Sequence, residues 1–200
     1  MYPFESLNRT LFLQLNGKPD AAPWEVMLAV GLADYLILLI PLLLLVMWFR
    51  GDRARREVAL RAVGVTVLAL GIGQLVGMAL PHPRPFMIGL GHTWLVHVPD
   101  ASFPSDHATV FASVALSLLL DGAVWPAATT FLAGLAVAWA RIFLGVHFPF
   151  DMLGALLVSA LAAVLLSALW RRLGTQIADQ AERLYRFVFA RPIAAGMLRR

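Results

Sequence analysis

The sequence predicts an all-α protein that crosses a membrane several times, and three observations lead to this fold class. First, 60% of the 200 residues are hydrophobic and only 14% are charged, which leaves too little polar surface to cover a soluble domain. Second, several apolar stretches approach the length of about 20 residues that a helix needs to cross a hydrocarbon core. Third, polar residues gather in short islands between these stretches. We therefore expect one compact, polytopic helix bundle.

About five stretches are predicted to span the membrane. The third is short as an apolar run, but Ser105 is a good N-cap and the pair Asp121 and Gly122 is a good stop signal, so a compact helix fits there. The five predicted spans lie at about residues 24–49, 58–80, 107–120, 123–143 and 150–170.

An amphipathic helix is expected at each end of the chain. Residues 3–16 alternate apolar and polar groups at helical spacing, which predicts an N-terminal interfacial helix. No basic start leads into an apolar core there, so we expect no cleaved signal peptide. After Trp170 the chain becomes amphipathic and basic. We therefore divide it into a membrane domain at residues 1–173 and a cytoplasmic amphipathic helix with a basic tail at residues 174–200.

The lysine and arginine residues predict the orientation of the bundle, because they favour the cytoplasmic side. Only four of the 16, Arg9, Lys18, Arg84 and Arg141, fall on one side of the predicted topology. The sequence thus indicates a multi-pass protein of the cytoplasmic (inner) membrane, with a cytoplasmic C-terminus and a loop at residues 81–106 that faces the periplasm or cell exterior. The other twelve lie on the opposite side: Arg50, Arg53, Arg55, Arg56, Arg61, Arg171, Arg172, Arg183, Arg186, Arg191, Arg199 and Arg200.

The composition also restricts the partners and the chemistry. The chain has no cysteine, which excludes disulfides, thiolate catalysis and Cys-ligated metal. Its net charge is +4, but the basic residues sit at helix ends and not on a polar face with interleaved aromatics, so we expect no nucleic-acid partner. Membrane lipids are the better partner, and the sequence leaves the oligomeric state open.

Three polar islands interrupt the apolar chain, and the predicted topology brings them to the same, non-cytoplasmic end of the bundle. They are PHPRPF at residues 81–86, SFPSDHA at residues 102–108 and ARIFLGVHFPFD at residues 140–151. Charged side chains at membrane depth are costly unless they pair or line a wet cavity, which makes a functional site the default interpretation.

Two arginines in these islands indicate an anionic ligand. Arg84 and Arg141 offer planar, permanently charged donors that match phosphate oxygens. Ser105 and the free backbone N–H groups at the start of the third span, with Asp106 at the edge, add donors and the positive end of a helix dipole. Together these residues predict a phosphate cradle.

The histidines and an aspartate supply the chemistry. His147 and Asp151 are four residues apart at the start of the fifth span, so the carboxylate can accept a proton from one ring nitrogen and leave the other free to attack. His107, as an imidazolium, could protonate the departing oxygen. The expected reaction is two in-line displacements through a phosphohistidine, with water attacking in the second. We expect no metal or other cofactor, because the arginines neutralise the developing charge and would repel a cation.

The three islands resemble the signature motifs of the type 2 phosphatidic acid phosphatase family of membrane lipid phosphatases. Those motifs are Lys-x6-Arg-Pro, Pro-Ser-Gly-His and Arg-x5-His-x3-Asp, and here they read GMALPHPRP, PSDH and ARIFLGVHFPFD. The resemblance implies an integral membrane phosphatase with His147 as nucleophile, His107 as general acid and Asp151 as orienting carboxylate. It also implies that the phosphate ligands are Arg84, Ser105 and Arg141.

The chain departs from the motifs at three positions. Gly77 stands where the family has its lysine, and Asp106 replaces the glycine of the second motif. Ala140 stands where a serine usually precedes the arginine of the third motif. Gln74 and His82 are candidates to substitute for the lysine. The longer run GHTWLVHVPDASFPSDHA resembles the branch of bacterial undecaprenyl diphosphate phosphatases, in which an aspartate also occurs in the second motif.

Other polar residues have simpler interpretations. His82, His92 and His97 are expected to be packed or interfacial, because a single histidine in an apolar context usually is. Asp34 is expected to pair or hydrogen bond inside the bundle, with a proton relay as the alternative. Asp100 could pair with a nearby arginine.

Three functional hypotheses remain at this point. The first is hydrolysis of undecaprenyl (polyprenyl) diphosphate to the monophosphate and inorganic phosphate, which recycles the lipid carrier of cell-wall (peptidoglycan) synthesis. The second keeps the fold and changes the lipid phosphate to phosphatidate, phosphatidylglycerol phosphate or a lipid-linked sugar phosphate. The third is a non-catalytic anion or lipid transporter, for which the sequence lacks repeated halves and broken helices.

Overall fold

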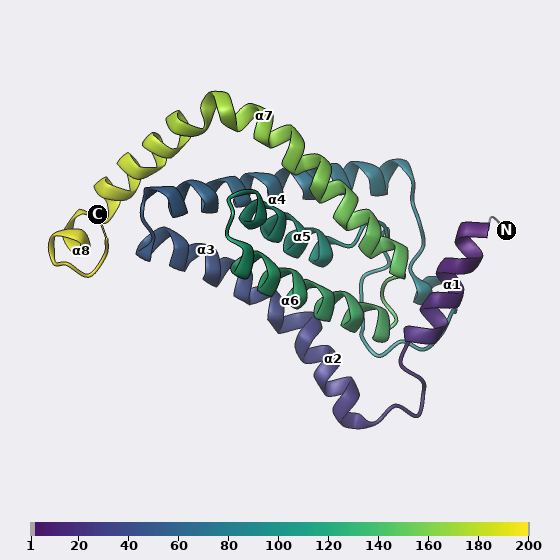
Figure 1. Ribbon diagram of the computed structural model, residues 1–200. Coiled ribbons are helices and arrows are strands. Elements are labelled where there is room, and N and C mark those ends of the chain that lie inside the picture. The colour runs from purple at the N-terminus through teal and green to yellow at the C-terminus, as the bar shows by residue number, and fades with distance from the viewer. Residues whose placement is uncertain (1–2, 200) are drawn as a thin grey trace.

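The fold is a bundle of helices, as the sequence predicts (Figure 1). The computed structural model describes residues 3–199, and these form helices and loops without a strand. Arg200, counted above among the cytoplasmic cations, lies outside this range. The elements are α1 (Pro3–Leu15), α2 (Pro23–Tyr35), η1 (Leu36–Leu38), α3 (Leu39–Arg50), α4 (Arg53–Ala79), η2 (Pro85–Ile88), α5 (Asp106–Leu120), α6 (Val124–Phe143), α7 (Pro149–Val188) and α8 (Ala190–Ala194).

The five predicted spans are all helical, and their lengths differ in an informative way. Four segments are long and apolar enough to cross a membrane: 23–50, 53–79, 124–143 and 149–188. The first consists of α2 and α3 joined by the 3-10 turn η1, an interruption that the sequence did not predict. Helix α5 has only 15 residues, or about 22 Å at 1.5 Å per residue. It can be short because it is surrounded by protein, so it does not have to match the thickness of the lipid.

Helix α5 forms the centre of the bundle, between α4, α6 and α7. Its buried side chains include Phe111, Val114 and Leu118, which pack against residues of α3, α4 and α6. Small residues let the helices approach closely: a Cβ at Gly134 would lie 2.7 Å from the Cβ of Phe111. The buried hydroxyl of Ser113 bonds the hydroxyl of Ser159 across the α5–α7 contact at 3.0 Å. This packing fixes the start of α5 relative to that of α7.

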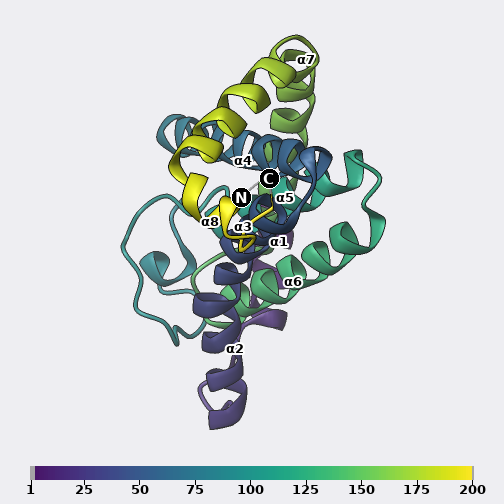
Figure 2. The ribbon, with the colours of Figure 1, turned by 90° about the vertical axis from the view of Figure 1, so that its left-hand side faces the viewer.

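Helix α7 continues well beyond the predicted end of the fifth span. It runs for 40 residues without a break and bends, so that its second half returns towards the loop between α3 and α4 (Figure 1). Seen from the side in Figure 2, α2 and this second half lie on opposite sides of the bundle. The predicted domain boundary at residue 173 thus falls inside one helix, and the division into a membrane domain and a cytoplasmic tail stays a prediction.

The second half of α7 is held by a buried ion pair. Arg56, with 2% of its surface exposed, lies 3.5 Å from Glu182 and donates to the carbonyl oxygen of Trp48. Its guanidinium also lies 4.6 Å from the ring centre of Tyr185. This cluster joins the end of α7 to the start of α4.

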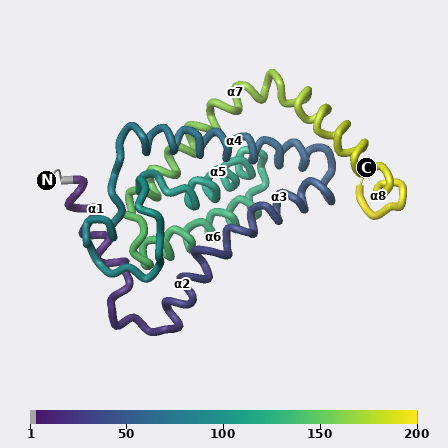
Figure 3. The backbone as a smooth tube through the Cα atoms, turned by 180° about the vertical axis from the view of Figure 1, so that it is seen from behind, coloured from purple at the N-terminus to yellow at the C-terminus, as the bar shows by residue number. Residues whose placement is uncertain are grey.

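The N-terminal helix α1 is present where it was predicted, and its location in the membrane interface stays a prediction. It packs on the other end of the bundle through Phe12, which is fully buried against Phe148. Asn8 accepts a hydrogen bond from the backbone N–H of Phe150 at 3.0 Å. Figure 3 shows that the same end holds the loop at residues 80–105, the end of α6 and the start of α7. The three polar islands therefore meet there.

Candidate active site

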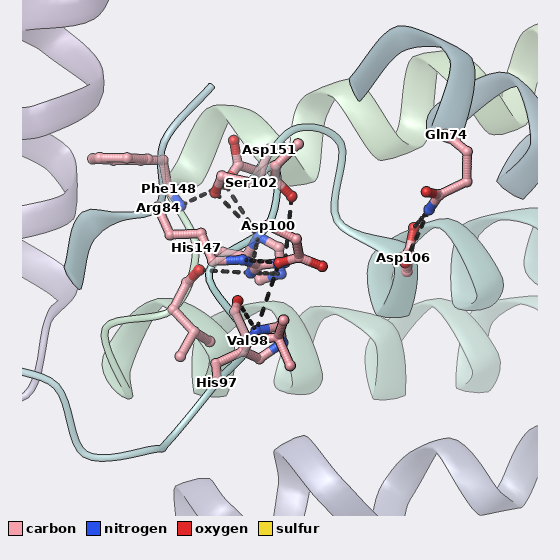
Figure 4. Close-up of polar contacts among 12 residues, drawn as sticks. Gln74, Arg84, His97, Val98, Asp100, Ser102, Asp106, His147, Phe148 and Asp151 are labelled. Atoms are coloured by element: carbon pink, nitrogen blue, oxygen red, sulfur yellow. Dashed lines mark hydrogen bonds and ion pairs between the residues drawn. The ribbon is translucent and has the colours of Figure 1, made fainter. Parts of the chain in front are cut away.

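The site forms where four helix ends converge. Arg84 precedes η2, Ser105 caps α5, Arg141 lies in the last turn of α6 and Asp151 in the first turn of α7. His147 lies in the short connection between α6 and α7. Figure 4 shows Arg84, His147 and Asp151 pointing towards one another.

A glycine makes the turn that presents His147. Gly145 has a φ of 83°, a left-handed conformation that favours glycine. A Cβ at this position would also collide with the carbonyl oxygen of His92. The sharp turn lets the chain leave α6 and place His147 above the first turn of α7.

His147 and Asp151 form a buried, oriented pair. The Nδ1 atom of His147 lies 3.1 Å from Oδ2 of Asp151, and the two side chains are 3% and 1% exposed. The same oxygen accepts hydrogen bonds from the backbone N–H of Phe148, at 2.7 Å, and from the hydroxyl of Ser102. Three donors thus hold one carboxylate oxygen in place.

The partners of His147 define its tautomer. A carboxylate only accepts, so Nδ1 carries the hydrogen that bonds Asp151. On the other side, the guanidinium Nη1 of Arg84 lies 3.0 Å from Nε2, and a guanidinium only donates. The lone pair is therefore on Nε2. Burial lowers the pKa of His147 to about 4, although the hydrogen bond to Asp151 opposes the shift, so the ring is neutral at pH 7. A neutral imidazole with an oriented Nε2 is what a nucleophile requires.

Arg84 is buried and fully engaged. Besides His147, it donates to the carbonyl oxygens of Val146, at 2.9 Å, and Ala101, at 3.4 Å. Its Nε atom bonds Asp100 at 2.8 Å, which is the pairing that the sequence suggested for that acid. Burial alone would raise the pKa of Asp100, but the hydrogen bond and charge of Arg84 lower it overall. Asp100 is therefore ionised at neutral pH.

Arg141 contrasts with Arg84. It is only 4% exposed, and its buried Nε atom has no hydrogen-bond partner. Among residues 3–199 it forms no ion pair. A buried cation without a partner is costly, so this side chain is prepared for an anion that comes from outside the chain.

The start of α5 supplies further donors. Ser105 is buried and caps the helix, with its hydroxyl accepting from the backbone N–H of Ala108 at 3.5 Å. The backbone N–H groups of Asp106 and His107 have no partner within the described chain. The His107 ring is partly buried and within electrostatic range of Arg141 and His147. The phosphate cradle that the sequence predicted is thus consistent with the geometry, although its roles stay predictions.

Asp106 lies at the edge of the site, and the role expected there for its backbone N–H stays a prediction. Its carboxylate is exposed and accepts a bond from Gln74 at 3.3 Å, away from His147 (Figure 4). Gln74 is therefore already engaged. His82, the other candidate for the missing lysine, lies 3.3 Å from Glu5 and packs on Phe148. Neither side chain extends a free charge into the site.

Sequence reasoning missed two residues of the site. Ser102, fully buried, holds Asp151, and His97 lies with its ring centre 6.4 Å from that of His147. Ser102 belongs to the second polar island, and that position was its only signal. His97 was expected to be an ordinary packed residue. Both belong to a loop whose path no periodic pattern predicts.

The described residues offer no evident metal site. Within residues 3–199, no group of three or more His, Cys, Asp or Glu side chains is placed to hold a metal ion. The expectation of a metal-free reaction stays a prediction.

The site combines an oriented neutral imidazole with two buried guanidiniums and a helix N-terminus, and it lies at one end of the helix bundle. Groups of these kinds are suited to bind and transfer a phosphoryl group. Residues 58–174 match the family model described as the PAP2 superfamily, and the chain belongs to this superfamily. It is an integral membrane phosphatase.

Relatives agree with this assignment, and a solved structure shares the fold. The chain is 36% identical to YbjG of Escherichia coli (strain K12) over 195 residues, which are 98% of each protein. It is 35% identical to "Undecaprenyl-diphosphatase BcrC" of Bacillus subtilis (strain 168) over 155 residues, covering 76% of this chain and 78% of that one. The fold is similar to that of Aquifex aeolicus LpxE, with a TM-score of 0.66, 23% identity and coverage of 80% and 93%.

Proposed function

We propose that this protein hydrolyses undecaprenyl diphosphate to undecaprenyl phosphate and inorganic phosphate, through a phosphohistidine on His147. The observation that carries the mechanism is the buried His147, whose Nδ1–H is held by Asp151 and whose Nε2 faces Arg84. The substrate is supported by the name of the B. subtilis relative. The reaction would return the lipid carrier of cell-wall synthesis to use.

The first displacement transfers the terminal phosphoryl group to the protein. The anion binds Arg141 and the free N–H groups at the start of α5, and it draws Arg84 away from Nε2. Nε2 then attacks phosphorus, and the bond between phosphorus and the bridging oxygen breaks. His107, protonated at this stage, gives its proton to the departing lipid phosphate. The charge left on the phosphorylated ring is stabilised by Asp151 through Nδ1–H.

The second displacement restores the protein. His107, now neutral, accepts a proton from a water molecule that attacks phosphorus in line. The bond between phosphorus and Nε2 breaks, inorganic phosphate leaves, and His147 returns to its neutral form. Arg84 and Arg141 neutralise the equatorial oxygens in both steps.

An apolar groove beside the site fits the lipid chain. It has a volume of about 190 Å³ and lies between α5, α6 and α7. It begins at Ala108 and Met152, which are adjacent in sequence to His107 and Asp151, and is otherwise lined by apolar side chains such as Phe131 and Leu156. We assign the first isoprene units to this groove, with the rest of the chain in the bilayer.

The site is proposed to face the periplasm or cell exterior from the cytoplasmic (inner) membrane, with the C-terminus in the cytoplasm. The distribution of arginines supports this orientation. The chain has no cysteine, so single cysteines can be introduced without background. Met87→Cys, beside the site, should react with a membrane-impermeant maleimide added to intact cells, and Met197→Cys only after lysis. The reverse labelling pattern would overturn the orientation.

The decisive test of the function is phosphate release by the purified protein. Undecaprenyl diphosphate, phosphatidate and phosphatidylglycerol phosphate are supplied in parallel, each with and without chelator. We expect the highest kcat/KM with undecaprenyl diphosphate, no effect of the chelator and no turnover by His147→Ala. Preference for phosphatidate would reject the substrate, and full activity of His147→Ala would reject the nucleophile.

A further inference from the structure

His97 is turned towards the catalytic cluster from an exposed loop. Its neighbours Val96 and Val98 are among the most exposed apolar residues of the chain, whereas the His97 side chain is 22% exposed. Its ring lies edge-on to that of His147, with 6.4 Å between the centres (Figure 4). Apolar side chains outside and an imidazole inside are the reverse of what burial alone would favour.

The hydrogen bonds of His97 leave one ring nitrogen available. Nδ1 lies 3.0 Å from the carbonyl oxygen of Val98, which only accepts, so Nδ1 carries the hydrogen. No protein atom within residues 3–199 is recorded as a partner of Nε2. This nitrogen can therefore bind a ligand, by accepting a hydrogen bond or, once protonated, by donating one.

The surroundings of His97 become less positive when an anion binds. Burial lowers the pKa of His97, and the nearby Arg84 and Arg141 lower it further, while Asp100, at 3.8 Å, has the opposite effect. These effects together favour the neutral ring. A bound diphosphate would neutralise the two arginines, and the ring could then take up a proton and provide a third cation. A third cation matters here because Gly77 stands at the position of the lysine in the family's first motif.

We propose that His97 binds the second phosphate of a diphosphate substrate, the phosphate that stays on the lipid when the terminal one is transferred. This inference rests on the proposed function, since a monophosphate has no second group for His97 to contact. The terminal phosphate is held by Arg84, Arg141 and the start of α5, next to His147. His97 contacts the adjacent phosphate from the loop side and so makes the site selective for diphosphates.

The test compares two soluble inhibitors that differ by one phosphate-like group. Methylenediphosphonate, which is not hydrolysed, and inorganic phosphate are titrated against the purified protein while it hydrolyses whichever lipid phosphate it turns over fastest. His97→Ala should raise the inhibition constant of methylenediphosphonate at least tenfold and that of phosphate less than threefold. His97→Gln, which keeps a donor of similar reach, should recover part of the loss.

His92→Ala is the matched control. His92 lies on the same loop, but its ring packs on Trp94, with 4.5 Å between the centres. This variant should leave both inhibition constants within about twofold of wild type. Equal weakening of both inhibitors in His97→Ala, or no weakening of either, would overturn the inference. Failure of the wild type to hydrolyse undecaprenyl diphosphate would reject the proposed substrate instead, and the inhibitor ratio would still decide the role of His97.

Discussion

Ser102→Ala provides the sharpest test of how the nucleophile is oriented. The Ser102 hydroxyl is fully buried and donates to Oδ2 of Asp151, the same oxygen that holds Nδ1 of His147. A hydrogen bond to a charged group contributes about 1.5–3 kcal/mol net. At about 1.4 kcal/mol per factor of ten, full expression of this loss in the transition state corresponds to roughly 10–150-fold in kcat.

The structure places the expected loss near the lower end of that range. After the substitution, Oδ2 still accepts from Phe148 N–H at 2.7 Å and from His147 at 3.1 Å, so two of three donors remain. We expect kcat to fall about 10–30-fold. KM should be unchanged, because Ser102 acts through Asp151 and not on the substrate.

The assay is steady-state phosphate release, with Ser113→Ala as the matched control. Ser113 is also fully buried and loses a single side-chain contact, to Ser159, in the core of the bundle. Its variant should keep the wild-type kcat at a comparable loss of thermal stability. A wild-type kcat in Ser102→Ala, or a change confined to KM, would refute the orienting role of the hydroxyl.

Three further predictions concern buried ionisable side chains. Arg141→Met should abolish turnover and yet raise the free energy of unfolding by about 1–3 kcal/mol, because it removes a buried cation that has no partner among residues 3–199. A destabilised variant in a thermal-unfolding assay would contradict this. Burial lowers the pKa of His147 from 6.5 to about 4, so its ring should stay neutral down to about pH 4 in NMR spectra of the histidine-labelled protein. Its contribution to stability should be complete above pH 6.5 and lost as the pH falls from 6.5 to 4. Arg56→Gln breaks a buried ion pair at the opposite end of the bundle and should cost about 3–5 kcal/mol of stability without changing kcat. The exposed Arg55→Gln is the control and should change stability by less than about 0.5 kcal/mol. Loss of kcat in stably folded Arg56→Gln would show coupling between the two ends.

The parts of the site that the sequence predicted lie at or beside helix ends. His147 precedes α7 and Asp151 lies four residues later in its first turn, whereas Arg84 and Arg141 stand out because a charge is costly in an apolar context. These features are local and periodic, so they can be seen in a single sequence. The end-to-end alternation of the spans then places them together without knowledge of any contact.

The parts that the sequence did not predict depend on irregular backbone or on tertiary contacts. His97 and Ser102 lie on the loop between η2 and α5, where the direction of a side chain depends on turns that no repeat encodes. The end of α7 was placed near Trp170 because the composition changes there. The helix continues because no proline interrupts residues 171–188 and because Arg56 and Glu182 secure its far end.

The two arginines of the site play different parts, and their surroundings explain the difference. Arg84 has four acceptors among residues 3–199. One of them is Nε2 of His147, the atom that we propose attacks phosphorus, and Arg84 therefore covers it. Arg141 has no hydrogen-bond acceptor or ion-pair partner among residues 3–199, so we expect it to attract an incoming phosphate more strongly. A phosphate bound at Arg141 would have oxygens near Arg84. Nη1 of Arg84 can then bond a charged phosphate oxygen in place of the neutral Nε2 of His147, while Nε of Arg84 stays bonded to Asp100. In the proposed reaction this exchange would uncover Nε2 only when a phosphate is present, and it would link the start of the reaction to the arrival of the substrate.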